Sequence, residues 1–134
     1  MPPEHPRITV VNDNPEFLAL MQDLLQDATY PATLIDGDRP NAVELIEAAE
    51  PHVLIIDLRM GSQELHGWEI LKEVRKRPAL RSLPTVICTG DAWATETLAD
   101  EVAAMPSVAI LHKPFTIDGL HAAIDEALSS SVTD

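Results

Sequence analysis

The sequence predicts an α/β fold, in which one parallel β-sheet is covered by helices on both faces. Short aliphatic runs alternate five times with segments whose apolar residues recur at helical spacing, and this alternation is typical of βα units. Several runs are apolar without interruption, as expected for strands buried on both faces. A chain of 134 residues with 46% hydrophobic content can bury one core, so a single domain is expected over residues 1–134.

The expected strands are rich in valine, isoleucine and leucine and end at polar or turn residues. In chain order they cover residues 7–12, 31–36, 52–57, 84–89 and 107–112. The second stops at Asp36-Gly37-Asp38, a sequence typical of turns. The third contains four successive aliphatic residues starting at Val53, which indicates a strand in the middle of the sheet.

The expected helices have apolar residues at intervals of three and four. In chain order they cover residues 15–27, 40–50, 67–77, 92–104 and 116–129. The first has Asn14 as its N-cap and Pro15 at its first position. The third ends at Pro78, and the fourth is rich in alanine. The folded core is therefore expected over about residues 7–128, with a polar, frayed tail at residues 129–134.

The composition excludes several classes of function. The net charge of −13 argues against nucleic acid, so the expected partners are proteins. The one basic cluster, residues 75–77 with Arg81, is interpreted as a solvated helix end that the helix dipole stabilises. No apolar run approaches the roughly 18–20 residues of a membrane span, and a single cysteine suits a reducing compartment. No membrane association and a cytoplasmic location are expected.

Four of the expected strands end in side chains that can carry chemistry. Asp13 follows the first, Asp57 closes the third, Thr89 closes the fourth, and Lys113 follows the fifth. These side chains are expected to converge, because the carboxyl ends of parallel strands line one crevice. Two carboxylates can hold a divalent cation, while a hydroxyl and an ammonium can bind phosphate oxygens. The set predicts a phosphoryl-transfer site.

With these residues the chain resembles the receiver domain of two-component response regulators, the single-domain kind typified by chemotaxis regulators. The motifs that carry the resemblance are Asn12-Asp13-Asn14-Pro15, Asp57-Leu58-Arg59-Met60, Thr89-Gly90 and Lys113-Pro114-Phe115. Each motif lies at a strand end, and together they extend the resemblance from about Arg7 to Leu128. The resemblance implies a flavodoxin-like three-layer sandwich with five helices and strand order 2-1-3-4-5.

The resemblance also implies a role for each residue of the site. Asp57 would accept a phosphoryl group as an aspartyl phosphate, and Lys113 and the Thr89 hydroxyl would bind the phosphoryl oxygens. The Lys113–Pro114 bond would be cis. The implied cofactor is Mg²⁺, and its implied ligands are Asp13, Asp57, the backbone carbonyl of Arg59, and Asn12 through a water molecule.

The resemblance further implies partners. A sensor histidine kinase or a histidine phosphotransfer protein would donate the phosphoryl group, and an unknown downstream protein would read the output by contact. The chain is expected to act as a stand-alone receiver without an effector domain, and not as an enzyme that turns over an added substrate. Many receivers form homodimers through the face of the fourth helix, fifth strand and fifth helix, and the sequence leaves this open.

The chain departs from the family pattern at several positions. Asn12 stands where the family usually has an acid, which predicts weaker Mg²⁺ binding. Gly67 lies two residues further from Asp57 than is usual, so the loop between them is expected to be longer. Arg59 and Asp91, each two residues beyond a site residue, place opposite charges at the mouth of the site.

Three other functions fit these residues less well. A pseudo-receiver, a protein-interaction module that is not phosphorylated, is favoured slightly by Asn12 and disfavoured by the four intact site residues. A phosphatase of the haloacid dehalogenase type needs a second acid where Arg59 stands. FMN binding is disfavoured because residues 12–16 would repel a phosphate group. The histidines lack metal-ligand spacing, and His66 and His112 are interpreted as solvated side chains.

Overall fold

The computed structural model describes residues 5–58, 65–90 and 96–132. Its centre is a five-stranded parallel sheet in the order β2-β1-β3-β4-β5. The strands are β1 (Ile8–Asn12), β2 (Ala32–Asp36), β3 (Val53–Ile56), β4 (Thr85–Thr89) and β5 (Val108–His112). The predicted strand order and direction are confirmed.

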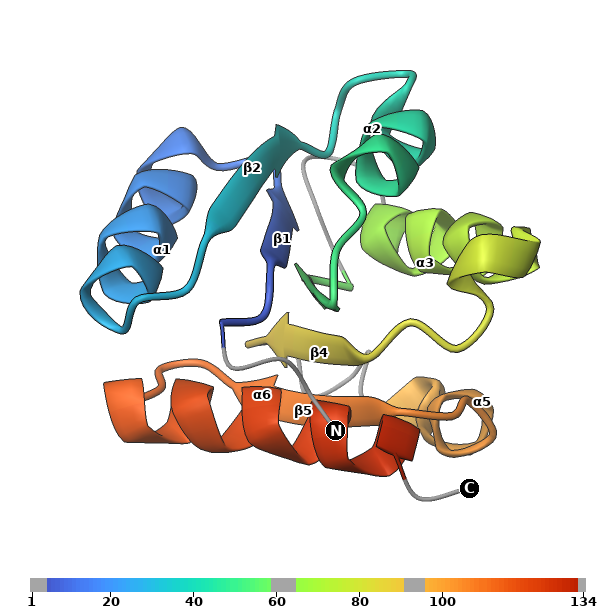
Figure 1. Ribbon diagram of the computed structural model, residues 1–134. Helices are drawn as coiled ribbons and strands as arrows, with labels where there is room; N and C mark the ends of the chain where they lie inside the picture. Colours follow the sequence, from blue (N-terminus) through green and yellow to red (C-terminus); the bar gives the residue numbers. More distant parts are fainter. Residues whose placement is uncertain (1–4, 59–64, 91–95, 133–134) are drawn as a thin grey trace.

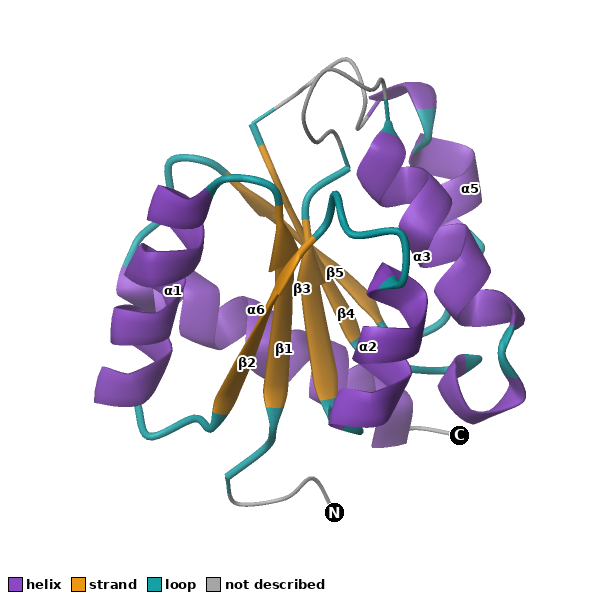
Figure 2. Ribbon diagram, turned by 90° about the horizontal axis from the view of Figure 1, so that it is seen from above, coloured by secondary structure: helices purple, strands orange, loops and turns teal. Residues whose placement is uncertain are grey.

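Helices cover both faces of this sheet, which gives the three layers that the sequence predicts (Figures 1 and 2). The helices on one face are α1 (Pro15–Asp27) and α6 (Ile117–Val132). Those on the other face are α2 (Ala42–Ala49), α3 (His66–Lys76) and α5 (Ala99–Ala103). A 3-10 turn, η1 (Pro78–Leu80), leads from α3 toward β4.

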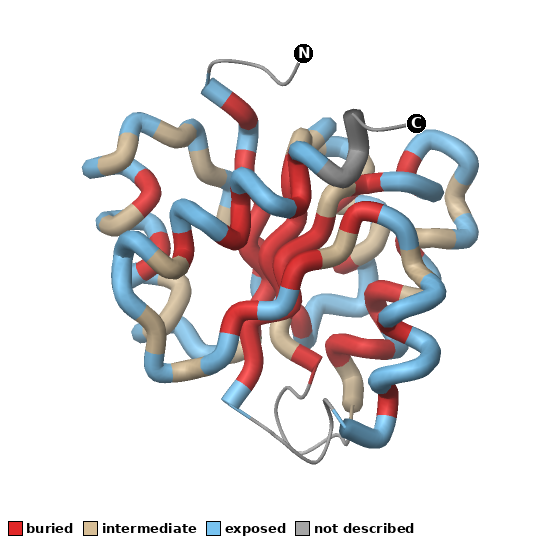
Figure 3. The backbone as a smooth tube through the Cα atoms, turned by 90° about the horizontal axis from the view of Figure 1, so that it is seen from below, coloured by how far each residue is buried: buried red, intermediate tan, exposed pale blue. Residues whose placement is uncertain are grey.

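Two apolar clusters hold the layers together, one on each face of the sheet, and the buried residues concentrate in its centre (Figure 3). The cluster under α2 and α3 includes Val11, Leu54, Ile46 and Leu71. The cluster under α1 and α6 includes Val10, Ile55, Met21, Leu25 and Ile124. Every residue of β1, β3 and β4 is buried. Of the three, only β3 is apolar throughout, and β1 and β4 also bury threonine or asparagine because helices cover both faces of the sheet.

The fourth expected helix, residues 92–104, is not continuous. Residues 96 and 97 are helical, Leu98 is in a turn, and α5 begins at Ala99, whereas residues 91–95 lie outside the described part. Leu98 has non-helical backbone angles (φ −101°, ψ 11°), and its side chain is buried in the same cluster as Val102. Tertiary packing here overrides the helix propensity of an alanine-rich segment.

The last helix is longer than expected, because α6 continues to Val132. The segment 129–134, expected to be frayed, is therefore helical as far as that residue, and residues 133–134 lie outside the described part. No proline or glycine interrupts residues 129–132, and the preceding Ala127 and Leu128 are buried against the sheet. Among the described residues, no helix has both the length and the apolar character that crossing a lipid bilayer requires.

Candidate functional site

An ion pair joins two of the predicted site residues across the strand ends. The Nζ atom of Lys113 lies 2.7 Å from Oδ2 of Asp57. Lys113 follows β5 and Asp57 follows β3, with β4 between those two strands. Their side chains are 31% and 12% exposed, so the pair is partly shielded from water. The predicted convergence of these two residues is confirmed.

Further contacts surround Lys113. Its backbone N–H donates a hydrogen bond to the Thr89 carbonyl at 2.9 Å. Gly90 borders its aliphatic stem, since a Cβ atom at Gly90 would lie 3.6 Å from Lys113 Cβ. The ammonium lies 4.5 Å from the centre of the Phe17 ring. The Lys113–Pro114 peptide bond is cis, as the resemblance implied.

Asn12 and Asp13 lie at the end of β1, beside the phosphoacceptor candidate. The register of β1 with β3, continued by one residue, places Asn12 beside Asp57. Asn12 is buried, and its Oδ1 atom accepts the backbone N–H of Asn14 at 2.9 Å. Because an amide oxygen has two lone pairs, one remains for a water molecule. The next residue, Asp13, is half-buried at the same end of the sheet.

The start of α1 is fixed beside this crevice by its cap. The Oδ1 atom of Asn14 accepts the backbone N–H groups of Glu16 at 2.9 Å and Phe17 at 3.3 Å. Pro15 occupies the first helical position, so the capping predicted from the sequence is confirmed. The first helical turn therefore has a defined place next to the ends of β1 and β5.

Thr89 and Cys88 lie at the end of β4. Thr89 is fully buried, and its backbone carbonyl receives the hydrogen bond from Lys113. Burial raises the pKa of the Cys88 thiol to about 11, the Lys113 charge lowers it and the Asp57 charge raises it. Cys88 is a free, buried thiol that stays protonated near neutral pH, which makes it a poor nucleophile. The interpretation of Cys88 as an inert core residue agrees with this placement.

The first turn of α3 packs directly against the backbone of the phosphoacceptor candidate. A Cβ atom at Gly67 would lie 1.6 Å from the Asp57 carbonyl oxygen, so only glycine fits there. The backbone N–H of Trp68 donates to the Leu58 carbonyl at 3.2 Å. The sequence marked Gly67 only as the end of a long loop, whereas the structure makes it a contact of the site.

His66 has a structural contact that the sequence did not reveal. Its Nε2 atom lies 3.0 Å from the Gly37 carbonyl oxygen, and the Gly37 N–H donates to the Asn12 carbonyl at 3.1 Å. The ring is half-buried, so the interpretation of His66 as a solvated side chain is wrong. The turn after β2 is thus linked to both the end of β1 and the start of α3, a connection that a turn signal alone cannot predict.

The oxygen donors at the strand ends suit Mg²⁺. Asp13 and Asp57 offer carboxylate oxygens, and Mg²⁺ commonly takes one or two carboxylates while keeping several waters. The described residues contain no group of three or more His, Cys, Asp or Glu side chains that could hold a metal ion. Arg59, whose carbonyl was an implied ligand, and Asp91 lie outside the described residues.

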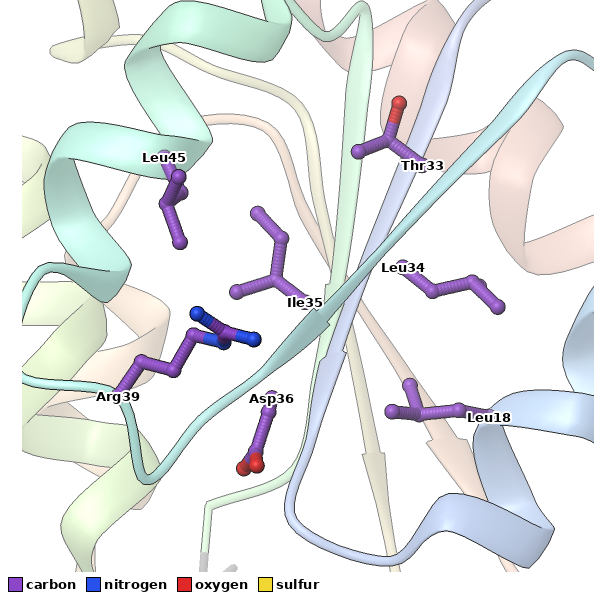
Figure 4. Close-up of a pocket in the computed structure, with 7 residues that line it drawn as sticks. All are labelled: Leu18, Thr33, Leu34, Ile35, Asp36, Arg39 and Leu45. Carbon is purple, nitrogen blue, oxygen red and sulfur yellow. The ribbon is translucent and has the colours of Figure 1, made fainter.

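A cavity of about 410 Å³ lies along the edge strand β2 (Figure 4). It is lined by Leu18, Thr33, Leu34, Ile35, Asp36, Arg39 and Leu45. In Figure 4, Leu18 and Leu34 lie on one side of β2, and Ile35, Arg39 and Leu45 lie on the other. The hollow therefore follows the open edge of the sheet. None of the predicted site residues lines it, so the crevice at the strand ends remains the candidate site.

Comparisons with known proteins point to one family. A family model described as the response regulator receiver domain matches residues 8–125. The chain is 28% identical over 127 residues to protein Rrf1 of Nitratidesulfovibrio vulgaris, covering 92% of this chain and 83% of that protein. It is also 28% identical over 123 residues to the transcriptional regulatory protein PdtaR of Mycobacterium tuberculosis, covering 92% of this chain and 57% of that protein.

Two solved structures share the fold over nearly the whole chain. The chemotaxis response regulator CheY4 of Vibrio cholerae superposes with a TM-score of 0.76 at 24% identity, covering 92% of this chain and 99% of that one. A response regulator receiver protein from Sinorhizobium medicae superposes with a TM-score of 0.76 at 25% identity, covering 96% of this chain and 98% of that one.

Proposed function

The chain belongs to the response regulator receiver domain family, and from this premise we propose that it accepts a phosphoryl group on Asp57. The observation that supports the proposal is the ion pair of 2.7 Å between Asp57 and Lys113. It brings a carboxylate nucleophile and a phosphate-binding cation together at the strand ends, where ligands bind in open α/β sheets. A carboxylate that is 12% exposed remains accessible to a donor.

In the proposed reaction, an Asp57 oxygen attacks the phosphorus atom of a phosphohistidine or a small acyl phosphate. The new O–P bond forms as the bond between phosphorus and the donor breaks, and the donor leaves with that electron pair. The Lys113 ammonium binds a phosphoryl oxygen, and the Thr89 hydroxyl donates to another. Both groups stabilise negative charge that the carboxylate alone would repel.

Asp13 and Asp57 would hold Mg²⁺ together with the Arg59 carbonyl and a water molecule bound by Asn12. When bound, Mg²⁺ supplies positive charge that offsets the repulsion between two carboxylates and an incoming phosphoryl group. Because Asn12 is neutral and buried, one charge fewer faces the metal than in the family pattern. The proposed consequence is weaker Mg²⁺ binding that still permits phosphorylation.

The proposed donor is a sensor histidine kinase or a histidine phosphotransfer protein in the cytoplasm. The output is a contact with a downstream protein, because a surface with net charge −13 disfavours nucleic acid.

Incubation with acetyl phosphate and Mg²⁺, followed by intact-mass analysis, tests the central proposal. We expect one added phosphoryl group that is labile in alkali, and Asp57→Asn removes it because the amide cannot act as the nucleophile. Asp36→Asn is the matched control, since Asp36 closes β2, which β1 separates from β3, and is exposed. Equal phosphorylation of the Asp57→Asn protein would assign the phosphoacceptor elsewhere.

A pseudo-receiver is the second candidate, and the neutral, buried Asn12 is the observation that favours it. In that case the protein would bind its partner without any phosphoryl group. Wild-type protein that takes up no phosphoryl group from acetyl phosphate or from phosphorylated donor proteins, and binds its partner as well as Asp57→Asn does, would establish this candidate.

A further inference from the structure

The Lys113 ammonium contacts the Phe17 ring as well as Asp57. The proposed reaction does not by itself require an aromatic ring there. We propose that Phe17 is a positioning residue: its ring holds the ammonium beside Asp57 and so sets the rate at which the phosphoryl group is accepted. This inference rests on the proposed function, because it concerns the same site. It adds a residue that none of the motifs contains.

The position of the Phe17 ring is fixed by the start of α1. Phe17 lies in the first turn of α1, where its backbone N–H donates to the capping Oδ1 atom of Asn14 at 3.3 Å. Its side chain is half-buried and packs against the apolar cluster under α1 and α6. A capped first turn and a packed side chain leave the ring little freedom, so it can act as a rigid surface.

The ammonium meets this surface at a favourable distance. Lys113 Nζ is 4.5 Å from the ring centre, and cations within about 6 Å of an aromatic face are attracted to its quadrupole. The same ammonium is 2.7 Å from Asp57 Oδ2, and the lysine stem is bordered by Gly90. The ring therefore covers one side of the ammonium, while the ammonium donates its hydrogen bond to the Asp57 carboxylate.

This arrangement limits a side chain that is otherwise flexible. A lysine has four stem carbons and a strongly hydrated head group, so an unrestrained ammonium samples many rotamers and binds water. A ring that occupies one side of it favours the rotamers in which the ammonium lies next to Asp57. Catalytic groups that are already in place lower the barrier of the step that needs them.

An aromatic ring also suits the exchange of partners during the reaction. The ammonium must leave Oδ2 of Asp57 when that oxygen becomes bonded to phosphorus, and it must then bind a phosphoryl oxygen nearby. A carboxylate at position 17 would compete for the ammonium through a strong, directional ion pair. A ring attracts the cation over its whole face, so the ammonium can shift by a small distance without losing this contact.

The experiment compares Phe17→Leu, Phe17→Met and Phe17→Tyr with the wild type. The initial rate of phosphorylation by acetyl phosphate, measured with saturating Mg²⁺, should fall about three- to tenfold in the Leu and Met variants, which corresponds to about 0.7–1.4 kcal/mol. The Tyr variant keeps an aromatic face and should stay within about twofold of the wild type.

Tyr30→Leu is the matched control for the loss of an aromatic ring. Tyr30 packs against the same apolar cluster, but it follows the far end of α1, about 20 Å along the helix from its first turn. We expect a similar loss of packing and an unchanged rate of phosphorylation.

A second measurement tests the contact without any phosphorylation. The NMR signals of the Lys113 ε-methylene protons should be shifted upfield by the Phe17 ring current in the wild type and in Phe17→Tyr. The shift should be lost in Phe17→Leu and Phe17→Met. A wild-type protein without this shift would overturn the inference directly.

The kinetic outcomes separate this inference from the proposed function. If the wild type is phosphorylated and Phe17→Leu and Phe17→Met are phosphorylated at the wild-type rate, the positioning role is overturned and the proposed function stays intact. An equal loss of rate in Phe17→Tyr and Phe17→Leu would also overturn it, because the ring itself would then be unimportant. A wild type that accepts no phosphoryl group would overturn both.

Discussion

Because Asn12 is neutral, the crevice at the strand ends has one negative charge fewer than the family pattern. A unit charge about 5 Å from a cation is worth up to about 3 kcal/mol at an effective dielectric of about 20, and less when a water molecule intervenes. We therefore expect Asn12→Asp to tighten Mg²⁺ binding by about three- to thirtyfold, or about 0.7–2 kcal/mol, in a calorimetric titration.

The control for this substitution is Asn41→Asp, which adds the same charge at an exposed position before α2. It should change Mg²⁺ affinity much less than Asn12→Asp does, because long-range charge is screened by salt. Unchanged or weaker binding in Asn12→Asp would mean that the side chain at position 12 does not face the metal.

Cys88 should make stability depend on pH in alkaline solution. Burial raises the pKa of this thiol from 9.0 to about 11 in the folded protein. Above about pH 9 the unfolded chain therefore loses this proton first, which favours unfolding. We expect the free energy of unfolding to fall by about 2–3 kcal/mol between about pH 9 and pH 11 on this account, with the full contribution present below pH 9.

Urea unfolding of the wild type and Cys88→Ala over this pH range measures the effect. Tyr30 also has a pKa raised by burial and by Asp125, but it is present in both proteins and cancels in the difference. The two stability curves should converge as the pH rises. Parallel curves would show that the thiol is not shielded as the structure indicates.

At the scale of elements, Arg75 holds the connection between α3 and β4 in place through hydrogen bonds. Its guanidinium donates to the carbonyls of Arg81 at 3.2 Å and Leu83 at 2.9 Å, and to the Thr85 hydroxyl at 3.2 Å. Burial lowers the pKa of this guanidinium. The interpretation of residues 75–77 as a solvated basic helix end is therefore wrong for Arg75, whose charge is directed inward.

We expect Arg75→Ala to lower the free energy of unfolding by about 1–3 kcal/mol, because carbonyls next to β4 lose their donor. Arg75→Lys should recover only part of this loss, since one ammonium cannot reproduce the planar fork. Lys76→Ala is the matched control: Lys76 is 71% exposed and pairs with Glu73, so its loss should cost less than about 0.5 kcal/mol. Equal effects of the two alanine variants in urea unfolding would contradict the role of Arg75.

Sequence reasoning predicts the elements that depend on local pattern and fails where distant segments meet. The strands follow from aliphatic runs, whereas their order was implied by the family resemblance. The convergence of Asp57 and Lys113 follows from their places at the ends of parallel strands. The contact between Phe17 and Lys113 does not, because it depends on how α1 is seated beside the end of β5. The break at Leu98 was equally hidden, since burial of that side chain outweighs an alanine-rich helical pattern.

At the scale of the whole molecule, the excess of acidic residues should make stability depend on salt. The chain has 22 Asp and Glu against 9 Lys and Arg, and such self-repulsion destabilises a compact state. Raising NaCl from about 20 mM to about 500 mM shortens the screening length from about 20 Å to about 4 Å. We expect the urea midpoint, measured with EDTA, to rise with salt.

The variant Arg77→Ala should show a stronger dependence of the urea midpoint on salt. Arg77 links α3 to α2 through Glu44 and Glu47, at 3.1 and 2.6 Å, and salt weakens such exposed attractions. Without Arg77, the repulsion is larger and the rise with salt should be steeper. A midpoint that falls with salt in the wild type would show that these attractive pairs outweigh the net charge.

The close approach of Gly67 to Asp57 bears on how this chain tolerates change in length. Leu58 is buried, and its carbonyl accepts a hydrogen bond from the Trp68 N–H, while Gly67 packs against the Asp57 carbonyl. The residues at both ends of the intervening segment are therefore held in place by their own contacts. Closing a somewhat longer loop between fixed ends costs little, because the entropic penalty grows only with the logarithm of its length. Insertions beyond Arg59 can accumulate during evolution, or be engineered to carry an epitope or a reporter, while Asp57 keeps its place.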